Sequence, residues 1–424
     1  MIIRIASVVH NEVKRDARVL KQAATLKAAG HDVRLFGLSA DSDAEFDLPG
    51  DIPVRLGHRD LSGIKDRIQA EGLERNRENS VWTSFREQGD IVFRKVRDTF
   101  VPDVVHIHDH VALTAASQYK KAFDCGIVWD AHEIYEDLAG LEDVRRQVNP
   151  RIIRDNVDHI DGFITLNSSI AGFYAENYSG LPPAVLLPNA VEKVAQTRYD
   201  GRLHNAAGLA LDQRILLFQG GFSPHRGIHA LLEASRLLDE KWSLVFMGWG
   251  KLEKDIQEFI NANEREASRA RVAVIPGAPH DELLSWTAGA SLGAIPYEDT
   301  GLNHRFCSPN KLWEYPAAGV PILATDMPEM SRTITEWEIG LTIGRDLRPK
   351  DIAEAVNALG DEDLELLRTR CAAFAAGDAW QTYEPRLIDL YEKVARRNGF
   401  NGLERTWQKI VDFTYNLLGA QPRG

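Results

Sequence analysis

The chain alternates short apolar segments with longer segments of helical periodicity, and this alternation restricts the possible folds more than any other feature. It begins with "IIRIASVV", continues with the periodic "ARVLKQAATLKAAG", and returns to an apolar segment in "HDVRLFGL". Strands that alternate with helices form βαβ units, which build parallel sheets. We therefore predict an α/β protein, with Gly30 ending the first helix. The other expected strands are "DVVHIH", "GIVWDA", "GFITLN", "AVLLPNA", "RILLFQGG", "SLVFMGWG", "RVAVIPG", "LGAIPY" and "VPILATD".

The polar residues 192–213 carry no clear strand pattern and separate two series of such units. The chain has 424 residues, more than one hydrophobic core usually organises, so two domains are expected. We predict one doubly wound domain at 1–191, a linker at 192–213, a second domain at 214–385 and C-terminal helices at 386–424. Two such domains place a ligand cleft between them, at the carboxyl ends of their strands. The mixed-sign, helix-prone residues 61–100 favour a solvated helical face over a basic partner site.

Composition excludes several classes of protein. The net charge of −12 argues against a general nucleic-acid binder. No apolar segment reaches the roughly 18 residues that a membrane span requires. The N-terminal "MIIRIASVVH" has an arginine within its short apolar segment and no cleavage site, so we interpret it as a strand and not as a signal peptide. Cys125, Cys307 and Cys371 lack metal-like spacing, which favours a reduced, cytosolic compartment.

The segment "CSPNKLWEYPAAGVPILATD" predicts a helix followed by a buried strand. Ser308 is a suitable N-cap and Pro309 suits the first helical position, while Pro316 should kink the helix. The unpaired N–H groups at the start of a helix, together with Lys311, would form an anion site. Glu314, one turn further on, could accept from hydroxyl groups beside a bound phosphate. The alternative is a surface helix with a solvated glutamate.

The segment "FQGGFSPHRGIHALLEA" places glycines between an expected strand and an expected helix. Gly220 and Gly221 would end the strand and permit a close backbone approach, and Arg226 could bind phosphate oxygens through two N–H groups. The segment is neither a P-loop nor a complete dinucleotide-binding motif. Similar strand–loop–helix units follow, with Gly248 and Gly250 in "FMGWGKLEKDI" and Pro276 in "VIPGAPHDELL".

The order of these motifs resembles the GT4-type family of retaining glycosyltransferases, also called glycosyltransferase group 1. The resemblance is carried by Gly-Gly…Arg-Gly, "MGWG", "PGAPHDEL", "IPY" and "SPNKLWEYPAAGVPIL", and in the first half by "DARVLKQAATLKAAGHDV", "PDVVHIHDH" and "VWDAHEIYED". It covers about residues 1–395. It implies the GT-B fold, in which two Rossmann-like domains face each other across a nucleotide-sugar cleft. The first domain would lie on the acceptor side and the second would bind the donor.

The resemblance also implies roles for particular residues. The start of the Ser308–Lys311 helix would face the donor diphosphate, and Glu314 would accept hydrogen bonds from the ribose hydroxyls. Arg226 would neutralise the diphosphate as it leaves, which is where such a reaction needs charge stabilisation. The further donor-binding residues expected are Gly221, Gly250, Pro276, Ser308, Asn310 and Lys311.

His132 of "DAHE" matches the family's active-site histidine near the donor sugar. It follows an expected strand end and is flanked by Asp130 and Glu133, so a position at a ligand site is reasonable, although a lone histidine is more often structural. The resemblance places Asn11, His108 and Asp109 on the acceptor side.

Two positions depart from the family pattern. Phe222 stands where the family often has an arginine, and Phe306 stands where its first motif glutamate would hold a sugar hydroxyl. Glu298, Asp299 and Asn303 lie close by in sequence, and any of them could take over that contact. The departures indicate a subgroup, an altered donor or a loss of activity.

His106, His108, Asp109 and His110 form a dense polar cluster that could hold a metal, because the three histidines would share one face of a strand. Similar His-x-His segments in the family have no metal, so we predict none. The "DSD" at 41–43 follows an expected strand within a Ser- and Asp-rich loop, and we interpret it as a turn.

The implied function is transfer of a sugar from a UDP- or GDP-sugar to a hydroxyl acceptor, with retention of configuration and without metal or cofactor. Glycan, glycolipid or natural-product glycoside biosynthesis would be the setting, in the cytoplasm, with peripheral contact at the inner membrane face left open. One alternative is a catalytically silent GT-B-fold protein that binds a nucleotide or a partner. A sugar-nucleotide epimerase fits the Glu314 helix less well.

The C-terminal segment "NGLERTWQKIVDFTYNLLG" has an apolar helical face. Relatives often return their C-terminal helix to the first domain, so we expect residues 386–424 to dock there, and truncation at Asn398 to lower solubility and melting temperature. If the helix instead lies on a membrane, the truncated protein should stay folded and lose liposome binding. The apolar residues of this face are Leu403, Trp407, Ile410, Val411, Leu417 and Leu418.

Overall fold

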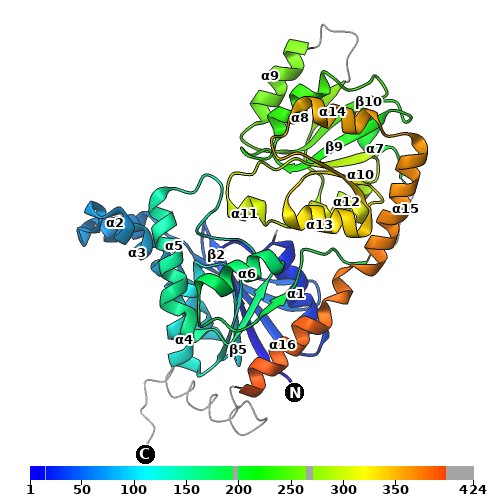
Figure 1. Ribbon diagram of the computed structural model, residues 1–424. Helices are drawn as coiled ribbons and strands as arrows, with labels where there is room; N and C mark the ends of the chain where they lie inside the picture. The colour runs from blue at the N-terminus through cyan, green and yellow to red at the C-terminus, as the bar shows by residue number, and fades with distance from the viewer. Residues whose placement is uncertain (15, 194–198, 264–270, 398–424) are drawn as a thin grey trace, which may run out of the picture. The chain divides into compact units, whose positions relative to one another are not determined.

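The computed structural model describes residues 1–14, 16–193, 199–263 and 271–397 (Figure 1). The chain forms two compact units. The first joins Met1–Pro188 to the described residues from Tyr383 onward, and the second runs from Asn189 to Thr382. The segment that we predicted as a linker, 192–213, therefore belongs to the second unit, where it contains a short helix, α7 (Arg202–Ala207).

The first unit is built on one eight-stranded sheet with the order β3-β4-β2-β1-β5-β6-β7-β8. Its strands pair in parallel except for β3, which pairs with β4 in an antiparallel hairpin. The sequence analysis did not predict this hairpin, which follows the expected turn at 41–43. The strands are β1 (Arg4–Val8), β2 (Asp32–Ser39), β3 (Ala44–Leu48), β4 (Ile52–His58), β5 (Val104–His108), β6 (Gly126–Asp130), β7 (Gly162–Thr165) and β8 (Ala184–Leu186).

Helices cover both faces of this sheet (Figure 1). Because the chain passes from β1 to β2 in one direction and from β4 to β5 in the other, right-handed crossovers put the connecting helices on opposite faces. One group contains α1 (Ala17–Ala28) and α16 (Glu384–Arg397), and the other contains α3 (Arg77–Thr99), α4 (Ala116–Phe123) and α5 (Asp143–Asn156). The remaining helices of the unit are α2 (Leu61–Ala70) and α6 (Ser168–Asn177).

Helix α1 begins and ends as its sequence indicates. The Asp16 carboxylate accepts a hydrogen bond from the Val19 N–H at the N-terminus, as an N-cap does. Gly30 follows the helix with a φ of +88°, in the left-handed region that glycine adopts without steric cost. The next residue pairs back into the structure, since the His31 N–H donates to the Leu26 carbonyl.

Helix α16 returns the chain to the first unit after it has built the second. It packs against α1 and the strands β5 to β8, and the Thr25 hydroxyl donates to Glu384 Oε1 at 3.1 Å. The return that the resemblance implied is therefore seen for residues 384–397. Residues 398–424, which include the predicted apolar face, lie outside the described residues. The side chains that α16 buries are Leu387, Leu390, Tyr391, Val394 and Ala395.

The second unit contains a six-stranded sheet with the order β11-β10-β9-β12-β13-β14, in which every strand pair is parallel. The strands are β9 (Arg214–Gly221), β10 (Trp242–Trp249), β11 (Val272–Ile275), β12 (Leu292–Ile295), β13 (Ile322–Thr325) and β14 (Gly340–Ile343). The first five coincide with predicted strands, whereas β14 was not predicted. Its core includes the aromatic residues Phe218, Phe222, Trp242 and Phe246, all fully buried.

Helices pack on both faces of this sheet as well. Those after β9 and β10 are α8 (Ile228–Ser235) and α9 (Glu253–Asn263), and α14 (Pro349–Asn357) packs against α8. The other helices are α10 (Leu283–Thr287), α11 (Leu302–Arg305), α12 (Lys311–Ala317), α13 (Pro328–Trp337) and α15 (Asp361–Gly377). Two parallel sheets with helices on both faces confirm the predicted α/β fold class.

In each sheet, two adjacent strands are followed by connections that run in opposite directions across the sheet. In the second unit, β9 has β10 on one side and β12 on the other. The loops that leave β9 and β12 at their carboxyl ends therefore run to opposite faces, and ligands bind in parallel sheets at such points. The same argument applies to β1 in the first unit, which lies between β2 and β5.

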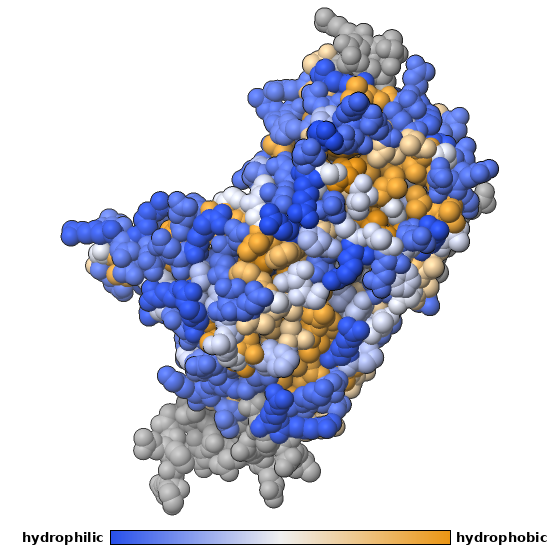
Figure 2. Space-filling view, in the orientation of Figure 1, coloured by the Kyte–Doolittle hydropathy of each residue, from blue (hydrophilic) through white to orange (hydrophobic). Residues whose placement is uncertain are grey.

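Among the described residues, no helix combines the length and the apolar character needed to cross a membrane. The face of the molecule in Figure 2 is mostly hydrophilic, with apolar patches scattered over it.

Candidate functional site

Glycines bring the ends of β9 and β10 into close contact. Gly220 has a φ of +109°, and a Cβ there would lie 3.2 Å from the Lys311 Nζ. A Cβ on Gly248 would overlap the Gly220 carbonyl oxygen, and one on Gly250 would overlap the Phe222 backbone. This close approach allows the Phe222 N–H to donate to the Trp249 carbonyl at 2.7 Å. The glycine-rich segments of the sequence thus form one narrow layer at the carboxyl edge of the sheet.

Glu314 is tied to the end of β9. Gln219 Nε2 donates to Glu314 Oε2 at 2.9 Å, and the Thr287 hydroxyl donates to Gln219 Oε1 at 2.7 Å. Gln219 and Thr287 are buried, and Glu314 is half-buried. The carboxylate is therefore held in a fixed position at the sheet edge, which does not fit the alternative of a solvated glutamate on a surface helix.

Two cations, Lys311 and Arg226, share the ring of Tyr297, and the charges of both Arg226 and Glu314 act on Lys311. The Lys311 Nζ donates to the Tyr297 hydroxyl at 3.3 Å, and the Arg226 guanidinium carbon lies 4.2 Å from the centroid of the same ring. Burial, and after it the charge of Arg226, lowers the pKa of Lys311 to about 8, with Glu314 opposing the change. Two like charges held together at a half-buried position favour the binding of an anion.

The start of α12 differs from the prediction. The helix begins at Lys311 with Asn310 as its N-cap, and no side chain caps it. Ser308 was predicted as the N-cap but lies two residues before the actual cap, because Pro309 and Asn310 form the first turn through the Leu312 N–H and Pro309 carbonyl. With seven residues, α12 has a small dipole. The positive charge at this edge therefore comes from side chains.

The other predicted donor residues lie at the ends of neighbouring strands. Gly221 is the last residue of β9, Gly250 follows β10, and Pro276 follows β11. Asn310 is exposed and Ser308 is buried, with the Ser308 carbonyl accepting from Asn189 Nδ2 at 3.2 Å.

The two departures from the family pattern have different surroundings. Phe222 is fully buried in the core, where its ring lies 6.1 Å from that of Phe246. Its side chain is therefore directed away from the sheet edge. Phe306 is half-buried and follows α11.

Among the three residues that could take over the contact of the missing glutamate, Glu298 is the best placed. Its Oε2 lies 3.0 Å from His225 Nδ1, next to Arg226. Asp299 is paired with Arg305 at 3.0 Å and is committed to that contact, while Asn303 is buried within α11.

In the first unit, Asp109 forms the centre of a second polar cluster. It directly follows β5 with a φ of +62°, a conformation that is uncommon outside glycine, although aspartate adopts it more often than most residues. Tyr135 donates its hydroxyl to Asp109 Oδ1 at 2.6 Å. His132 Nε2 lies 3.2 Å from Oδ1, and His10 Nδ1 lies 3.3 Å from Oδ2. Two of the predicted residues, His132 and Asp109, are thus in direct contact.

His132 and Asp109 each shift the pKa of the other. Burial is the largest single influence on His132 and would lower its pKa, but the carboxylates of Asp109, Asp130 and Glu133 together outweigh it and the pKa is raised. Burial alone would raise the pKa of Asp109, but His132 and His10 hold it well below its usual range. The nearby carboxylates therefore favour the protonated form of His132, whose Nε2 contacts Asp109.

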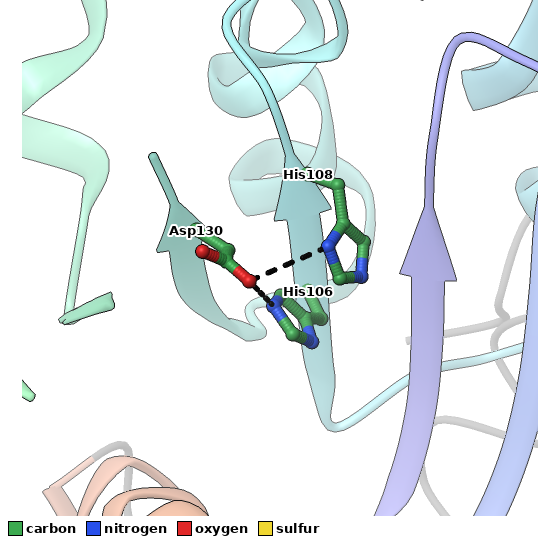
Figure 3. Close-up of side chains that lie close together, drawn as sticks. All are labelled: His106, His108 and Asp130. Atoms are coloured by element: carbon green, nitrogen blue, oxygen red, sulfur yellow. Dashed lines mark ion pairs between the residues drawn. The ribbon is translucent and has the colours of Figure 1, made fainter. Parts of the chain in front are cut away.

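His106 and His108 lie on one face of β5, beside Asp130 of β6 (Figure 3). His108 Nδ1 is 3.6 Å and His106 Nε2 is 4.0 Å from Asp130 Oδ2, and all three side chains are buried. His110 is apart from them, because the strand ends at His108; its ring packs 4.5 Å from that of Tyr135. The prediction that the three histidines share one face of a strand is therefore wrong.

The close grouping of His106, His108 and Asp130 resembles a metal-ligand set. However, Arg18 donates to both oxygens of Asp130 at 2.8 Å, and Gln22 Nε2 donates to Oδ2 at 2.7 Å. Both lone pairs of Oδ2 are therefore engaged, and a metal would lie against a guanidinium. The donor set does not fit a cation, and the cluster ties α1 to the sheet instead.

The two other predicted acceptor-side residues are engaged within the first unit. Asn11 Nδ2 donates to Asp16 Oδ2 at 2.8 Å, and Asn11 Oδ1 accepts from the Val13 N–H. The amide thus shapes the loop between β1 and α1. His108 Nε2 lies 3.0 Å from the Ser7 hydroxyl.

Sequence reasoning missed four residues of the β9 edge: Gln219, Thr287, Tyr297 and Trp249. Each has a site position only through contacts with residues far away in the chain, such as the 95 positions that separate Gln219 from Glu314. Two of them, Trp249 and Tyr297, stand within the quoted motifs "MGWG" and "IPY", and their aromatic character was the available signal.

Comparison with known proteins finds matches for both halves of the chain. Residues 213–362 match the family model of glycosyl transferases group 1, and residues 16–190 match that of the glycosyl transferase 4-like domain. D-inositol 3-phosphate glycosyltransferase of Corynebacterium urealyticum is 28% identical over 258 residues, which are 56% of this chain and 58% of that protein. The chain thus aligns with little more than half the length of this relative.

Solved structures resemble the whole chain in fold. Sucrose-phosphate synthase from Thermosynechococcus elongatus has a TM-score of 0.67 at 15% identity, covering 97% of this chain and 99% of that one. Anabaena HepE in complex with UDP-glucose has a TM-score of 0.66 at 12% identity, covering 92% and 99%. At such low identity the likeness concerns the fold.

Proposed function

The chain belongs to the GT4-type glycosyltransferases of group 1, which have the GT-B fold, and on this premise we propose that it transfers a sugar from a nucleotide-diphosphate-sugar to a hydroxyl acceptor with retention of configuration. The observation that carries the proposal is the grouping of Lys311, Arg226 and Glu314 at the carboxyl edge of β9. Two cations suit a diphosphate, and a fixed carboxylate beside them suits the hydroxyls of a ribose.

The proposed reaction places the charge change at these cations. The bond between the anomeric carbon and the diphosphate oxygen breaks, and the diphosphate leaves with the bonding electrons and one more negative charge. Arg226 and Lys311 stabilise that charge as it develops. The acceptor oxygen bonds to the anomeric carbon on the same face, and its proton passes to a phosphate oxygen of the leaving group.

Family correspondence alone assigns His132 to the donor sugar, with Asp109 orienting its ring. The family correspondence also suggests Asn11 and His108 on the acceptor side. Glu298 is our candidate for the contact that Phe306 cannot make, because it lies beside Arg226 in the second unit.

The proposed partners are a UDP- or GDP-sugar and a hydroxyl acceptor from glycan, glycolipid or natural-product glycoside biosynthesis. We propose that neither metal nor cofactor takes part, because the two cations can neutralise the diphosphate. We also propose a reduced, cytoplasmic location, because the sequence has only three cysteines and they lack metal-like spacing. Peripheral contact with a membrane surface is the alternative proposal for residues 398–424, which lie outside the described part of the chain.

The first test is the release of UDP or GDP from a panel of nucleotide sugars, with and without EDTA. We expect slow hydrolysis of one donor that EDTA leaves unchanged, and NMR of the glycoside formed with a found acceptor should show the donor's anomeric configuration. Strict dependence on a divalent metal, or an inverted product, would contradict the proposed mechanism.

The second candidate function is a catalytically silent protein that binds a nucleotide. It is favoured by Phe222, whose ring is in the core where relatives often present an arginine. Binding of a nucleoside diphosphate without turnover, across a broad panel of donors and acceptors, would support this candidate against the enzymatic one.

A further inference from the structure

We propose that Trp249 stacks on the nucleobase of the donor and forms the base subsite of the second unit. Among the large apolar side chains that are exposed in the described part of the chain, Trp249 is the one aromatic, with 62% of its surface exposed. Exposing an indole of this size to water is unfavourable by the area rule. An exposed aromatic ring next to a ligand-binding edge is therefore a natural contact surface for a planar ligand group.

One face of the Trp249 indole lies against the loop that follows β11. A Cβ on Gly277 would overlap two ring carbons of Trp249 and come within 3.5 Å of nothing else but the Gly248 Cα. The ring therefore rests on the Gly277 backbone, where any other residue would displace it. A flat aromatic surface that is supported on one side and exposed on the other is the geometry of a stacking platform.

The platform lies at a suitable separation from the proposed ribose and diphosphate groups. Trp249 is opposite Gly221 in the register of β9 and β10, while Gln219, which holds Glu314, is opposite Met247. Trp249 is thus two residues further along and one strand away from Gln219, which corresponds to about 8 Å between Cα atoms. A nucleoside whose ribose contacts Glu314 could extend its base toward this position.

The chemistry favours a nucleobase as the occupant. Stacking on an aromatic ring requires only a π-face, and every nucleobase has one. The inference rests on the proposed function, since it assigns the base end of the same donor. A sugar ring of an acceptor would be the competing occupant, because its apolar face can also lie on an indole.

The test compares ligands with and without a base. Calorimetry would measure the Kd of UDP, GDP, ribose 5-phosphate and inorganic pyrophosphate for the wild type, Trp249→Ala and Trp249→Phe. We expect Trp249→Ala to weaken UDP and GDP by about 5- to 140-fold, the equivalent of about 1–3 kcal/mol of stacking. Trp249→Phe should retain most of the affinity, and the two base-free ligands should bind all three proteins equally.

Leu237→Ala is the matched control, because Leu237 is a similarly exposed apolar residue of the same unit, at 52%, away from the β9 edge. It should leave every Kd unchanged. Gly277→Ala should reproduce part of the Trp249→Ala loss, since the added methyl displaces the indole.

The outcomes separate the inference from the proposed function. If the wild type binds UDP or GDP and Trp249→Ala binds them equally well, the base subsite is wrong and the proposed function stands. If the wild type binds no nucleoside diphosphate, the proposed function itself fails. If Trp249→Ala raises the KM of the acceptor alone, the platform holds the acceptor and not the base.

Discussion

The proposed role of Glu314 in donor binding depends on the negative charge of its carboxylate. We predict that Glu314→Gln weakens donor binding by about 1.5–3 kcal/mol, because charge-assisted hydrogen bonds to the ribose are lost. The melting temperature should change little, since a glutamine can still contact Gln219. Calorimetry with the preferred donor measures the effect. Glu354→Gln, an exposed position on α14, serves as the control, and equal donor affinity of both variants would remove Glu314 from the site.

Arg226 should matter more in the transition state than in the ground state. Because the charge on the diphosphate grows as the glycosidic bond breaks, we predict that Arg226→Ala lowers kcat by at least 100-fold, or about 3 kcal/mol, and raises the donor KM much less. Steady-state kinetics and thermal unfolding of the same preparation test this. A loss of melting temperature in proportion to the loss of rate would instead show that Arg226 supports the loop beside Tyr297.

Lys311 gives donor binding a pH dependence. In the free protein its pKa is lowered to about 8, whereas a bound diphosphate favours the charged form and raises it. Donor binding therefore takes up a proton, and we predict that Kd increases as the pH rises above about 8, by up to tenfold per pH unit. Lys311→Arg should bind without this dependence, because arginine stays charged.

The lowered pKa of Lys311 also makes the free energy of unfolding depend on pH. Donor binding weakens as the pH rises, whereas this contribution to stability increases. An unfolded lysine keeps its proton to about pH 10.4, so between pH 8 and that value the unfolded state binds more protons than the folded one. The contribution of Lys311 to the free energy of unfolding therefore rises with pH in this window. A Kd that is constant between pH 7 and 9.5 would contradict the assignment of Lys311 to the diphosphate.

At the level of elements, the turn before α8 depends on Gly227. Its φ is +68°, and a Cβ would overlap the Pro296 carbonyl oxygen at the end of β12. We predict that Gly227→Ala destabilises the second unit by at least about 1–2 kcal/mol from the left-handed conformation alone. Gly172→Ala in α6 is the contrasting variant, because no atom lies within 4 Å of that position; it should stabilise by about 0.5–1 kcal/mol. Chemical denaturation measures both, and a stable Gly227→Ala would show that the loop can move.

At the scale of the whole molecule, the chain leaves the first unit at Pro188 and returns to it at Tyr383. We predict that a chain stopped after Thr382 keeps a nucleotide-binding second unit but loses a folded first unit. Helix α16 buries five side chains, of which the three larger aliphatic ones, Leu387, Leu390 and Val394, correspond to roughly 4–9 kcal/mol as an upper value, comparable to the whole stability of a domain.

Circular dichroism, calorimetric unfolding and UDP or GDP binding would test this on two truncations. A chain stopped after Arg397 keeps α16 and serves as the control, and it also tests the separate expectation for the C-terminal segment. If both truncations unfold alike, the contacts of α16 contribute little to the first unit.

Much of the fold could be predicted from the sequence because the relevant signals are local. The apolar segments that became β1, β2 and β9 are mostly buried on a parallel sheet, so their pattern is nearly continuous and easily recognised. Strand β4 carries Pro53 and Gly57, and β3 carries charged residues at the sheet edge, so neither has that pattern. Strand β14 lies at the edge of its sheet and only Ile343 of its four residues is buried, so it has no continuous apolar pattern.

Two of the polar residues at the site could also be recognised from the sequence alone. Arg226 and Glu314 belong to motifs whose spacing along the chain is recognisable without a structure. Their chemical types, a bidentate cation and a carboxylate, follow from the residues themselves.

What the tertiary structure alone decided was which groups meet. The Glu314 carboxylate is held by Gln219, Lys311 and Arg226 share Tyr297, and Trp249 rests on Gly277. The partners in the first two contacts are 95 and up to 71 positions apart. The order of strands in the sheet and the crossing of the helices determine such contacts, and both depend on packing over the whole unit. No local pattern of the chain encodes them.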